Sequence, residues 1–492
     1  MNVLLVYPNY PDTFWSFKRA INFVGKKAAF PPLGLLTVAA MLPKDWKLRL
    51  VDMNVTSLRD KDVKWADYVF ISAMGIQENS VREIINRTKA LEKKIVVGGP
   101  LFTTAPELFP EVDHLVLNEA EITLPAFLED LSLGRAKRVY SSDKHPEITG
   151  TPLPLWKLIH LQDYSCMSIQ YSRGCPFDCE FCDIIFLDGH RPRTKSQEQI
   201  IRELDLLYNL RWRGSVFIVD DNFISNKKKL KEEILPAIIL WQKEKKYPFS
   251  FLAETSVNLA DDEDLMNLMA EAGFNRVFVG IETPNKDSLI ETGKTQNINR
   301  DLLGAVKILQ NHGLEVMGGF ILGFDNDNPD TIFVDLINFI QKSGIVVAMV
   351  GLLNAPKGTR LYERLHNEKR LTGSSSGNNM DSSLNFIPKI DREILLRGYK
   401  RVLETIYAPE KYYARIETFL KEYKPKTKSR IDRYQIQGFF NCLRIVGIKD
   451  NGRRHFWKLF LTALVKYSDA FPAFITLAIY GHHFRKVVAN IF

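Results

Sequence analysis

The sequence contains few cysteines and no signal-peptide pattern. Only five cysteines occur among 492 residues, and three of them are clustered. The chain therefore has no disulfide framework of the kind that small secreted domains use. Residues 1–7 lack a charged segment followed by an apolar one and predict a buried strand instead of a leader. We expect a reducing, cytoplasmic setting.

Long apolar runs are also missing, even near the C-terminus, where apolar residues are frequent. The 18 residues between Lys466 and Arg485 are interrupted by Asp469, Pro472 and Gly481. A transmembrane helix needs about 20 consecutive, mostly apolar residues. We therefore expect no membrane span in this stretch.

The positive charge of the chain is unevenly distributed. Residues 411–492 contain 16 Lys and Arg against 5 Asp and Glu, a balance of +11. Because the whole chain carries +8, the first 410 residues are near −3. The length predicts two or three domains, and the basic character belongs to the last of them.

Residues 1–150 predict an α/β domain with an open parallel sheet. Strand-like runs occur at 2–7, 47–52, 68–72, 94–98 and 114–117, with helical patterns between them such as 35–42. Ligands of such sheets bind beyond the carboxyl ends of the strands. Ser72, Gly98 and Gly99 lie at these ends, where small residues let the backbone approach a large ligand. Any Rossmann-like or flavodoxin-like domain fits this pattern.

A linker over residues 151–165 precedes a second α/β region, residues 166–370. Thr151-Pro152-Leu153-Pro154 disfavours helix and predicts extended chain. Six strand-like runs follow at 168–171, 215–219, 249–253, 276–280, 315–321 and 346–352, with helical stretches such as 197–210 and 303–312. Six such units predict a partial (βα)6 barrel, whose functional site lies at the carboxyl ends of the strands.

The most specific motif of the chain is Cys175, Cys179 and Cys182, with Phe181 just before the last cysteine. Three thiolates spaced C-x3-C-x2-C can hold three irons of a cubane cluster and leave the fourth iron without a protein ligand. The alternatives are core packing and a structural zinc site that includes His190. Packing poorly explains thiols in a loop rich in Gly, Pro and Asp, and zinc sites more often use two separate C-x2-C pairs. The pattern favours the cluster.

By this cysteine motif the chain resembles radical S-adenosylmethionine (SAM) enzymes. The resemblance implies a [4Fe–4S] cluster on Cys175, Cys179 and Cys182, with SAM at the open iron and cleaved to a 5′-deoxyadenosyl radical. Cys166 and Cys442 are too few for a second cluster.

The resemblance also implies SAM contacts at the carboxyl ends of the barrel strands. By similarity, the amino group would face Asp220 and Asp221, the ribose Glu254 or Glu282, and the adenine Gly318 and Gly319, with Phe181 as both core and cofactor contact. For any single one of these acidic residues, the alternative to a SAM contact is a role as the cap of the helix that follows it.

The N-terminal domain resembles the cobalamin-binding domain that precedes many radical SAM enzymes. Phe30-Pro31-Pro32-Leu33-Gly34, Gly98-Gly99-Pro100 and Asn118-Glu119-Ala120-Glu121 carry this resemblance. The Asp-x-His-x-x-Gly motif, which supplies an axial histidine in other cobalamin proteins, is missing: no histidine occurs between Asp52 and His114. This matches the radical SAM branch. Cobalamin is therefore expected at the strand ends of this domain, and a degenerate structural domain is the alternative.

Residues 371–492 predict a basic, α-helical extension. It comprises a polar loop at 371–379, amphipathic helices at 394–407 and 409–423, a basic connector at 423–433, and helices at 453–466 and 473–480. A basic, aromatic-rich helix can lie in a membrane interface. Peripheral contact with the inner face of the membrane is therefore one expectation, and an ordinary helical cap on the barrel is the other. No nucleic-acid recognition module is visible, so no nucleic-acid partner is expected.

The whole chain resembles cobalamin-dependent radical SAM enzymes with such an extension, and in particular the hopanoid A-ring C-methylases. This closer likeness rests on residues 168–172, 179–184, 219–224, 280–284 and 454–458. It implies a C-methyltransferase that adds a methyl group from SAM, through methylcobalamin, to an unactivated carbon of a hopanoid-type lipid. It also implies a reducing partner such as flavodoxin or ferredoxin. The alternatives are methylation, cyclisation or oxidation of a soluble metabolite, and a non-catalytic cobalamin sensor, which the cysteine motif disfavours.

Overall fold

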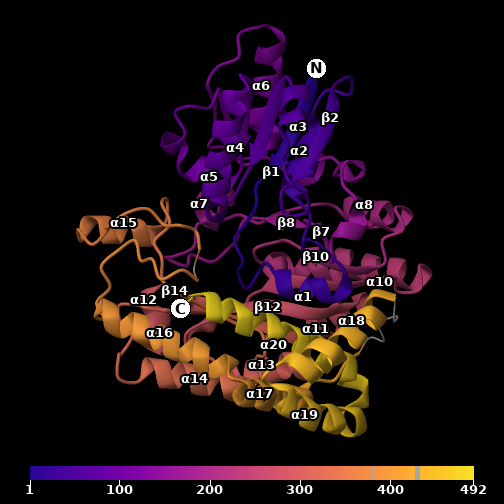
Figure 1. Ribbon diagram of the computed structural model, residues 1–492, viewed down its shortest axis with the longest axis vertical. Coiled ribbons are helices and arrows are strands. Elements are labelled where there is room, and N and C mark those ends of the chain that lie inside the picture. Colours follow the sequence, from indigo (N-terminus) through magenta and orange to yellow (C-terminus); the bar gives the residue numbers. More distant parts are fainter. Residues whose placement is uncertain (379, 427–432, 492) are drawn as a thin grey trace.

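The computed structural model describes residues 1–378, 380–426 and 433–491 (Figure 1). The N-terminal domain is a parallel sheet of six strands in the order β2-β1-β3-β4-β5-β6. The strands are β1 (Asn2–Tyr7), β2 (Lys47–Asp52), β3 (Tyr68–Ser72), β4 (Lys94–Gly98), β5 (His114–Val116) and β6 (Val139–Tyr140). The helices around it are α2 (Leu33–Met41), α3 (Asp60–Trp65), α4 (Glu78–Ala90), α5 (Pro100–Thr104) and α6 (Ala120–Ser132).

These strands are buried on both faces, which explains their continuous apolar sequences. Residues 3–6 of β1, for example, are fully buried. The predicted α/β domain is confirmed, and β1 to β4 have the predicted bounds. β6 was not predicted, because a strand of two residues leaves no periodic pattern.

The second sheet has six parallel strands in the order β14-β13-β12-β11-β10-β7. They are β7 (Cys166–Ile169), β10 (Gly214–Ile218), β11 (Phe249–Thr255), β12 (Phe274–Glu282), β13 (Glu315–Leu322) and β14 (Ala348–Leu352). The helices are α7 (Ile184–Asp188), α8 (Gln197–Asn209), α9 (Lys227–Lys229), α10 (Leu235–Glu244), α11 (Glu263–Ala272), α12 (Lys286–Glu291), α13 (Leu302–Asn311), α14 (Ile332–Ser343) and α15 (Arg360–Asn367). Consecutive strands are neighbours, as in an open half-barrel, which confirms the predicted architecture.

The first barrel strand ends earlier than predicted. β7 stops at Ile169, not at Tyr171, because the chain turns out of the sheet. The backbone N–H groups of Tyr171 and Ser172 donate to the carboxylate of Asp220, each at 2.7 Å. Ser172 then begins β8 (Ser172–Arg173), which pairs antiparallel with β9 (Arg193–Thr194). The Asp220 carboxylate thus accepts the hydrogen bonds that a neighbouring strand would otherwise accept from these two N–H groups.

The C-terminal region is helical, as predicted, and lies below the barrel in Figure 1. Its helices are α16 (Arg392–Tyr407), α17 (Pro409–Glu422), α18 (Arg433–Arg444), α19 (Arg453–Lys466) and α20 (Phe471–Ile491). α20 is longer than the predicted 473–480 because Gly481 does not break it. A Cβ at Gly481 would lie 2.3 Å from the Tyr412 ring, so the glycine permits close helix packing. Most of the predicted connector 423–433, and Asn379 of the predicted polar loop, lie outside the described residues.

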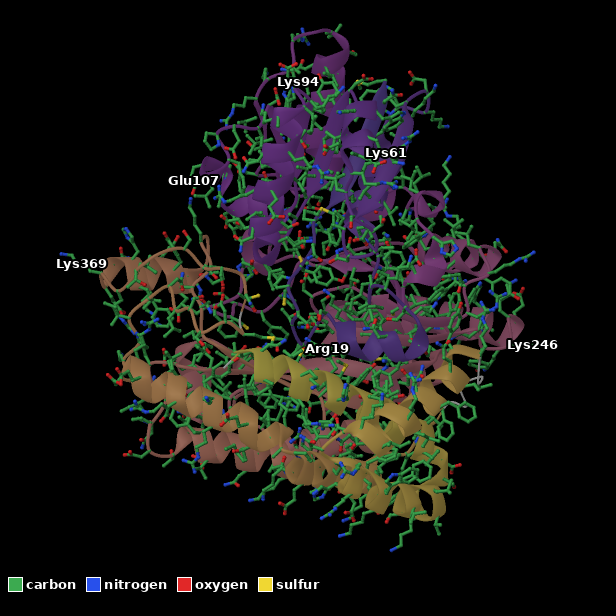
Figure 2. The ribbon with its side chains drawn as sticks, in the orientation of Figure 1. Arg19, Lys61, Lys94, Glu107, Lys246 and Lys369 are labelled. Carbon is green, nitrogen blue, oxygen red and sulfur yellow. The ribbon has the colours of Figure 1, made fainter. Side chains whose placement is uncertain are left out.

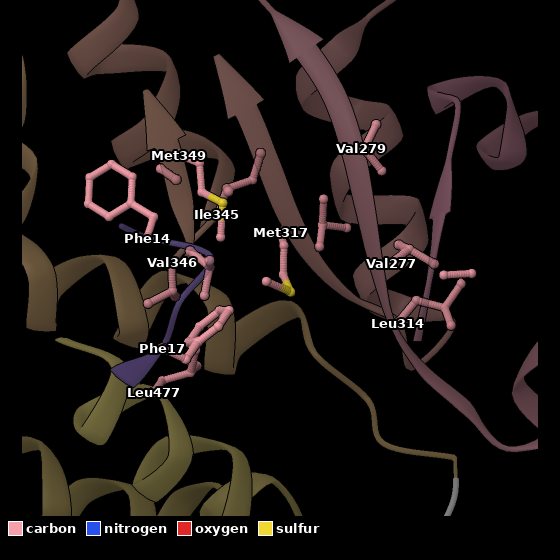
Figure 3. Close-up of a cluster of buried hydrophobic side chains, with 14 of the residues drawn as sticks. Phe14, Phe17, Val277, Val279, Leu314, Met317, Ile345, Val346, Met349 and Leu477 are labelled. Carbon is pink, nitrogen blue, oxygen red and sulfur yellow. The ribbon is translucent and has the colours of Figure 1, made fainter. Parts of the chain in front are cut away.

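A segment of the N-terminal domain packs against the barrel and the C-terminal helices. Phe14 and Phe17 precede α1 (Lys18–Ile21), and in Figure 3 Phe17 lies beside Leu477 of α20 while Phe14 lies on the side of Met349. The ring centroids of Phe14 and Phe484 are 5.3 Å apart, and those of Phe17 and Tyr480 are 5.0 Å apart. The three regions therefore share one apolar core.

A surface ion pair also joins the N-terminal domain to the barrel. Glu107, labelled on the N-terminal domain in Figure 2, accepts a hydrogen bond from Lys357 at 2.6 Å. Both side chains are about half exposed, so this pair contributes little stability. It nevertheless lies at the rim where the carboxyl ends of the two sheets face each other.

Candidate active site between the two sheets

A cavity of about 1090 Å³ lies between the carboxyl ends of the two parallel sheets. From the N-terminal domain it is lined by residues that include Ser72, Gly99, Thr103 and Asn118, and from the barrel by residues that include Phe181, Cys182, Asp221, Glu254, Glu282 and Gly319. Both sheets thus direct their predicted ligand-binding edges into one space. This volume slightly exceeds the range of about 300–1,000 Å³ that is usual for a single small-molecule site.

The three cysteines of the motif lie in the loop between β8 and α7. Cys182 lines the cavity, Cys179 is buried and Cys175 is partly buried. Gly174 begins the loop with φ of +88°, and a Cβ there would lie 2.8 Å from the carbonyl oxygen of Arg191. The loop is therefore entered through a conformation that only glycine adopts without strain.

The cysteine loop is anchored to the barrel by hydrogen bonds. The Glu180 N–H donates to the carbonyl of Thr292 at 2.8 Å, and the Leu361 N–H donates to the carbonyl of Glu180 at 2.9 Å. Arg364 donates to the Glu180 carboxylate at 2.7 Å. The Gln296 amide lies 3.7 Å from the sulfur of Cys179. The loop is therefore held by two segments of the barrel region, residues 292–296 and 361–364.

The donor set fits a [4Fe–4S] cluster. Burial raises the pKa of the Cys175 and Cys182 thiols, and the Lys294 ammonium opposes this rise. Coordination to iron ionises such thiols outright, and thiolates are the ligands that these clusters use. His190, the fourth residue of the zinc alternative, is exposed. Among the described residues, no three His, Cys, Asp or Glu side chains converge on the position of a single metal ion, as a structural zinc site would require.

Lys294 is a site residue that the sequence did not indicate. Its ammonium donates to Glu282 at 2.6 Å, and both side chains are about nine-tenths buried. Burial lowers the pKa of Lys294, but Glu282 and Cys179 together raise it by more. The net shift of the pKa is therefore upward. A Cβ at Gly280 would lie 2.3 Å from the Glu282 carboxylate, so the glycine makes room for this pair. A single lysine after a short helix carries no motif by which it could be found.

The two adjacent aspartates after β10 have different surroundings. Asp220 does not line the cavity: its carboxylate accepts from the Tyr171 and Ser172 N–H groups and from the Ser172 hydroxyl at 2.6 Å. Burial raises the pKa of Asp220 to about 7, although these hydrogen bonds lower it. Asp221 lines the cavity instead. Asp220 thus shapes the turn that leads to the cysteines, and Asp221 faces the space where SAM is expected.

Asp221 and Glu254 form an acidic part of the cavity wall. Burial raises the pKa of both, that of Glu254 to about 7, and Asp188 and Glu254 raise the pKa of Asp221 further. Within the described ranges, no other side chain donates a hydrogen bond to either carboxylate. Because a nearby cation favours the charged form of a carboxylate, this wall suits a positively charged ligand such as SAM.

The glycines of the predicted cofactor sites divide into cavity-lining and packing positions. Gly319 lines the cavity, whereas a Cβ at Gly318 would lie 2.8 Å from the Phe320 ring. Gly99 lines the cavity with φ of +91°, whereas a Cβ at Gly98 would lie 2.7 Å from the Val116 carbonyl oxygen. Gly98 and Gly318 therefore allow close packing next to the cavity. The predicted contacts Ser72 and Phe181 both line it.

A buried charge network joins the N-terminal domain to the cysteine loop. Glu119 accepts from Arg173 at 2.7 Å, from Arg193 at 2.8 Å and from His145 at 2.9 Å. Glu121 also accepts from Arg173, at 2.9 Å. Arg173 stands two residues before Cys175, so this network fixes the loop relative to the other domain. The sequence shows these residues but not their pairing.

The polar loop after residue 370 covers the side of the cavity. Ser374, Ser375 and Gly377 line it. Gly377 has φ of +69°, and a Cβ there would lie 2.7 Å from the Ile76 N atom of the N-terminal domain. This loop, which was predicted to follow the barrel, therefore reaches the opposite domain.

Comparison with known protein families finds three matches along the chain. A B12 binding domain matches residues 26–128, the radical SAM superfamily matches residues 169–340, and a domain of unknown function, DUF4070, matches residues 359–492. The first two matches coincide with the two sheets that face the cavity.

Two curated relatives extend over nearly the whole chain. An uncharacterized methyltransferase of Synechocystis sp. is 41% identical over 494 residues, covering 99% of this chain and 92% of that protein. The hopanoid C-2 methylase of Rhodopseudomonas palustris is 34% identical over 478 residues, covering 94% and 89%.

Solved structures share the fold. OxsB, a cobalamin-dependent SAM radical enzyme solved with aqua-cobalamin, has a TM-score of 0.64 at 14% identity, covering 100% of this chain and 81% of that one. The radical SAM methyltransferase TsrM of Kitasatospora setae has a TM-score of 0.60 at 16% identity, covering 95% and 99%. The domain matches and the relatives that extend over nearly the whole chain together show that the chain belongs to the cobalamin-dependent radical SAM methyltransferases, whose cofactors are a [4Fe–4S] cluster, SAM and cobalamin.

Proposed function

We propose that this protein methylates an unactivated carbon of a hopanoid-type lipid. The observation that carries the proposal is the 34% identity with the hopanoid C-2 methylase over 94% of this chain, a length that includes the C-terminal helices. A relative named for methylation of bacteriochlorophyllide d is less similar, at 26% identity over 70% of this chain. The likeness to the lipid methylase therefore extends beyond the shared cofactor domains.

The residues of the cavity have distinct roles in this proposal. Cys175, Cys179 and Cys182 would hold the cluster, Asp221 would face the cationic amino group of SAM, and Glu254 would face its ribose. When bound, the three cofactors supply a radical route by which a methyl group replaces hydrogen on carbon. The protein contributes by positioning the reactants and excluding water.

The N-terminal domain would hold cobalamin at the opposite wall of the cavity. Ser72 and Gly99 lie there, and Gly99 has the left-handed backbone that brings the chain close to a flat ligand. The loop with Ser374 and Ser375 closes the side of the cavity. These surfaces keep a reactive substrate carbon away from solvent.

The surface of α18 and α19 suits contact with a membrane, which would deliver such a lipid. Phe440 of α18, Ile448 between the two helices, and Leu461 and Val465 of α19 are between 63% and 81% exposed, and exposed apolar patches mark interaction surfaces. Lys458 and other basic residues of α19 are exposed beside them, and basic residues attract anionic lipid headgroups. Among the described residues, no helix is long and apolar enough to cross a bilayer.

Vesicle binding tests this membrane contact. The full chain should sediment with anionic phospholipid vesicles, and added salt should weaken the binding because screening reduces charge attraction. The double variant L461D/V465D should stay in the supernatant. The variant V334D is a matched control, because Val334 is also exposed, at 40%, but lies on α14. Equal sedimentation of all three proteins would contradict the membrane role.

Methyl transfer to lipid tests the proposed function itself. The protein is purified anaerobically with its cluster and cobalamin and is then incubated with SAM labelled in the methyl group, a reductant and a lipid extract of hopanoid-producing cells. Label should enter the hopanoid fraction, and the variant Cys179→Ala should transfer none. Label in the water-soluble fraction instead would contradict the lipid substrate and favour a soluble metabolite.

A further inference from the structure

A second cavity, of about 560 Å³, lies at the amino ends of the barrel strands, opposite the cofactor cavity. It is enclosed by α1, α18, α20 and the sheet, and its apolar lining includes Phe17, Ile21, Phe30, Met317, Phe439 and Ile475. Its volume lies within the range of about 300–1,000 Å³ that is usual for small-molecule sites. The roles assigned above make no use of this cavity.

The two cavities lie end to end on the same face of the barrel sheet. On β11, Leu252 lines the second cavity and Glu254 the cofactor cavity; on β13, Met317 lines the second and Gly319 the first. Residues two apart in a strand point to the same face and are separated by about 7 Å. Only one layer of side chains therefore separates the second cavity from the site of chemistry.

Trp15 belongs to that separating layer, because it lines both cavities. Its ring centroid lies 4.9 Å from that of Phe278, which lines the cofactor cavity. Trp15 is carried by the segment before α1 and is only partly buried. Rotation of this side chain would join the two spaces without movement of the sheet.

The polar groups in the second cavity are engaged with one another. The Arg276 guanidinium donates to the Ser215 hydroxyl at 2.9 Å and to the Tyr480 hydroxyl at 3.3 Å. Glu315 is close enough to raise the pKa of Arg276, although burial opposes this. Because Ser215 and Tyr480 are both joined to Arg276, the lining presents mainly hydrocarbon surface to a ligand, which favours an apolar molecule.

The mouth of the second cavity continues into the exposed apolar surface of α18 and α19. Phe440, which lines the cavity, is 63% exposed. From the lining residue Phe471, ring contacts run to Phe460 at 5.2 Å and then to Trp457 at 5.0 Å. Trp457 is 40% exposed. An apolar path thus joins the cavity to the surface assigned above to the membrane.

We propose that the second cavity binds the hydrocarbon ring system of the lipid substrate. The lipid enters from the membrane side past Phe440, and its reacting end passes Trp15 into the cofactor cavity. The identity of this ligand rests on the proposed function. The existence of an apolar ligand site rests on the cavity alone.

Binding of a tritiated pentacyclic triterpene hydrocarbon to the full holoenzyme tests this proposal. Thr476 of α20 lines the cavity, so Thr476→Trp should fill it and weaken binding about tenfold or more. Thr462→Trp on α19 is the matched control, because the two threonines make the same type of hydrogen bond within their helices. The Thr476 hydroxyl donates to the Pro472 carbonyl at 3.0 Å, and the Thr462 hydroxyl donates to the Lys458 carbonyl at 3.1 Å. Cluster absorbance and SAM cleavage without lipid should be unchanged in both variants, which verifies that they fold.

A photoreactive triterpene provides a second measurement on the wild-type protein. It should crosslink to peptides of α18 and α20 that contain Phe439 and Ile475. Crosslinks confined to the cofactor cavity, or equal triterpene affinity of the wild type and Thr476→Trp, would overturn the proposal even if lipid methylation were found. Binding that Thr476→Trp abolishes, without methylation of any lipid, would support the cavity and refute the proposed function.

Discussion

The variant Glu119→Gln tests the charge network between the two domains. Glu119 is only 6% exposed in its side chain, and its partners Arg173 and Arg193 are 14% and 4% exposed. The substitution keeps the volume of the side chain but removes the negative charge that two buried guanidinium groups share. Glu121 then remains as the carboxylate partner of Arg173, and Arg193 keeps only carbonyl acceptors.

The expected loss of stability is large for one substitution. Removal of one partner from a buried ion pair costs about 3–5 kcal/mol, because an uncompensated charge stays buried. We expect the lower end, about 3 kcal/mol, because the amide oxygen of the substituted side chain still accepts one hydrogen bond. For a domain of 150–250 residues, about 2–4 °C of Tm is lost per kcal/mol, so Tm should fall by about 6–12 °C.

Thermal unfolding of the full chain, followed by circular dichroism, measures this effect. Glu271→Gln is the matched control, because Glu271 forms a surface pair with Lys243 and both side chains are about half exposed. Such pairs contribute about 0–1 kcal/mol. Because Arg173 stands close to Cys175, Glu119→Gln should also retain less iron after purification. If the Tm and iron content of Glu119→Gln equalled those of Glu271→Gln, the network would not be what holds the loop.

Three further predictions concern the cofactor sites. Cys179→Ser should lose the visible absorbance of the cluster. Cys166→Ser should keep it, because Cys166 is a buried thiol whose pKa is raised to about 12. Equal spectra of the two variants would refute the assignment of Cys179 as a cluster ligand. Burial raises the pKa of Glu254 to about 7, so SAM affinity measured by equilibrium dialysis should rise as pH increases through 7 and the carboxylate forms, by at most about tenfold per pH unit. Glu254→Gln should flatten this rise, and an unchanged profile would exclude Glu254 from SAM binding. Gly99→Ala places a Cβ 2.8 Å from the Ser72 hydroxyl and should lower the amount of bound cobalt. Gly150→Ala should not lower it, because a Cβ there meets nothing within 4 Å. Equal cobalt content of the two variants would contradict the cobalamin site.

Much of the fold could be predicted because apolar periodicity is local. The buried strands β1 to β4 are short apolar runs with turn residues after them, and their bounds needed no tertiary information. The misplaced boundaries have tertiary causes. β7 ends early because the Asp220 carboxylate, about 50 residues away, takes the N–H groups of Tyr171 and Ser172. α20 continues through Gly481 because Tyr412 fills the space beside it.

The site was predictable to the extent that its signals lie within one segment. The cysteine triad occupies eight consecutive residues and defines a cluster by spacing alone. The network of Glu119 with Arg173 and Arg193 joins residues 54 and 74 positions apart, which no local pattern reveals. Asp221 faces the cavity whereas Asp220 accepts hydrogen bonds from a backbone turn, and two adjacent aspartates after a strand give no sign in the sequence of this difference.

The basic charge of the C-terminal region divides into a structural and a surface part. Arg415 is fully buried and donates to the carbonyls of Ile406 and Val346, so it fixes α17 to the barrel. Arg485 pairs with Asp450 at 3.0 Å and ties α20 to the start of α19. Arg453, Arg454 and Lys458, in contrast, are exposed next to the apolar surface of α19. Exposed groups such as these can attract anionic lipid, whereas Arg415 and Arg485 are held in contacts within the protein, so the salt dependence of membrane binding should come from the exposed basic groups of α19 and its surroundings.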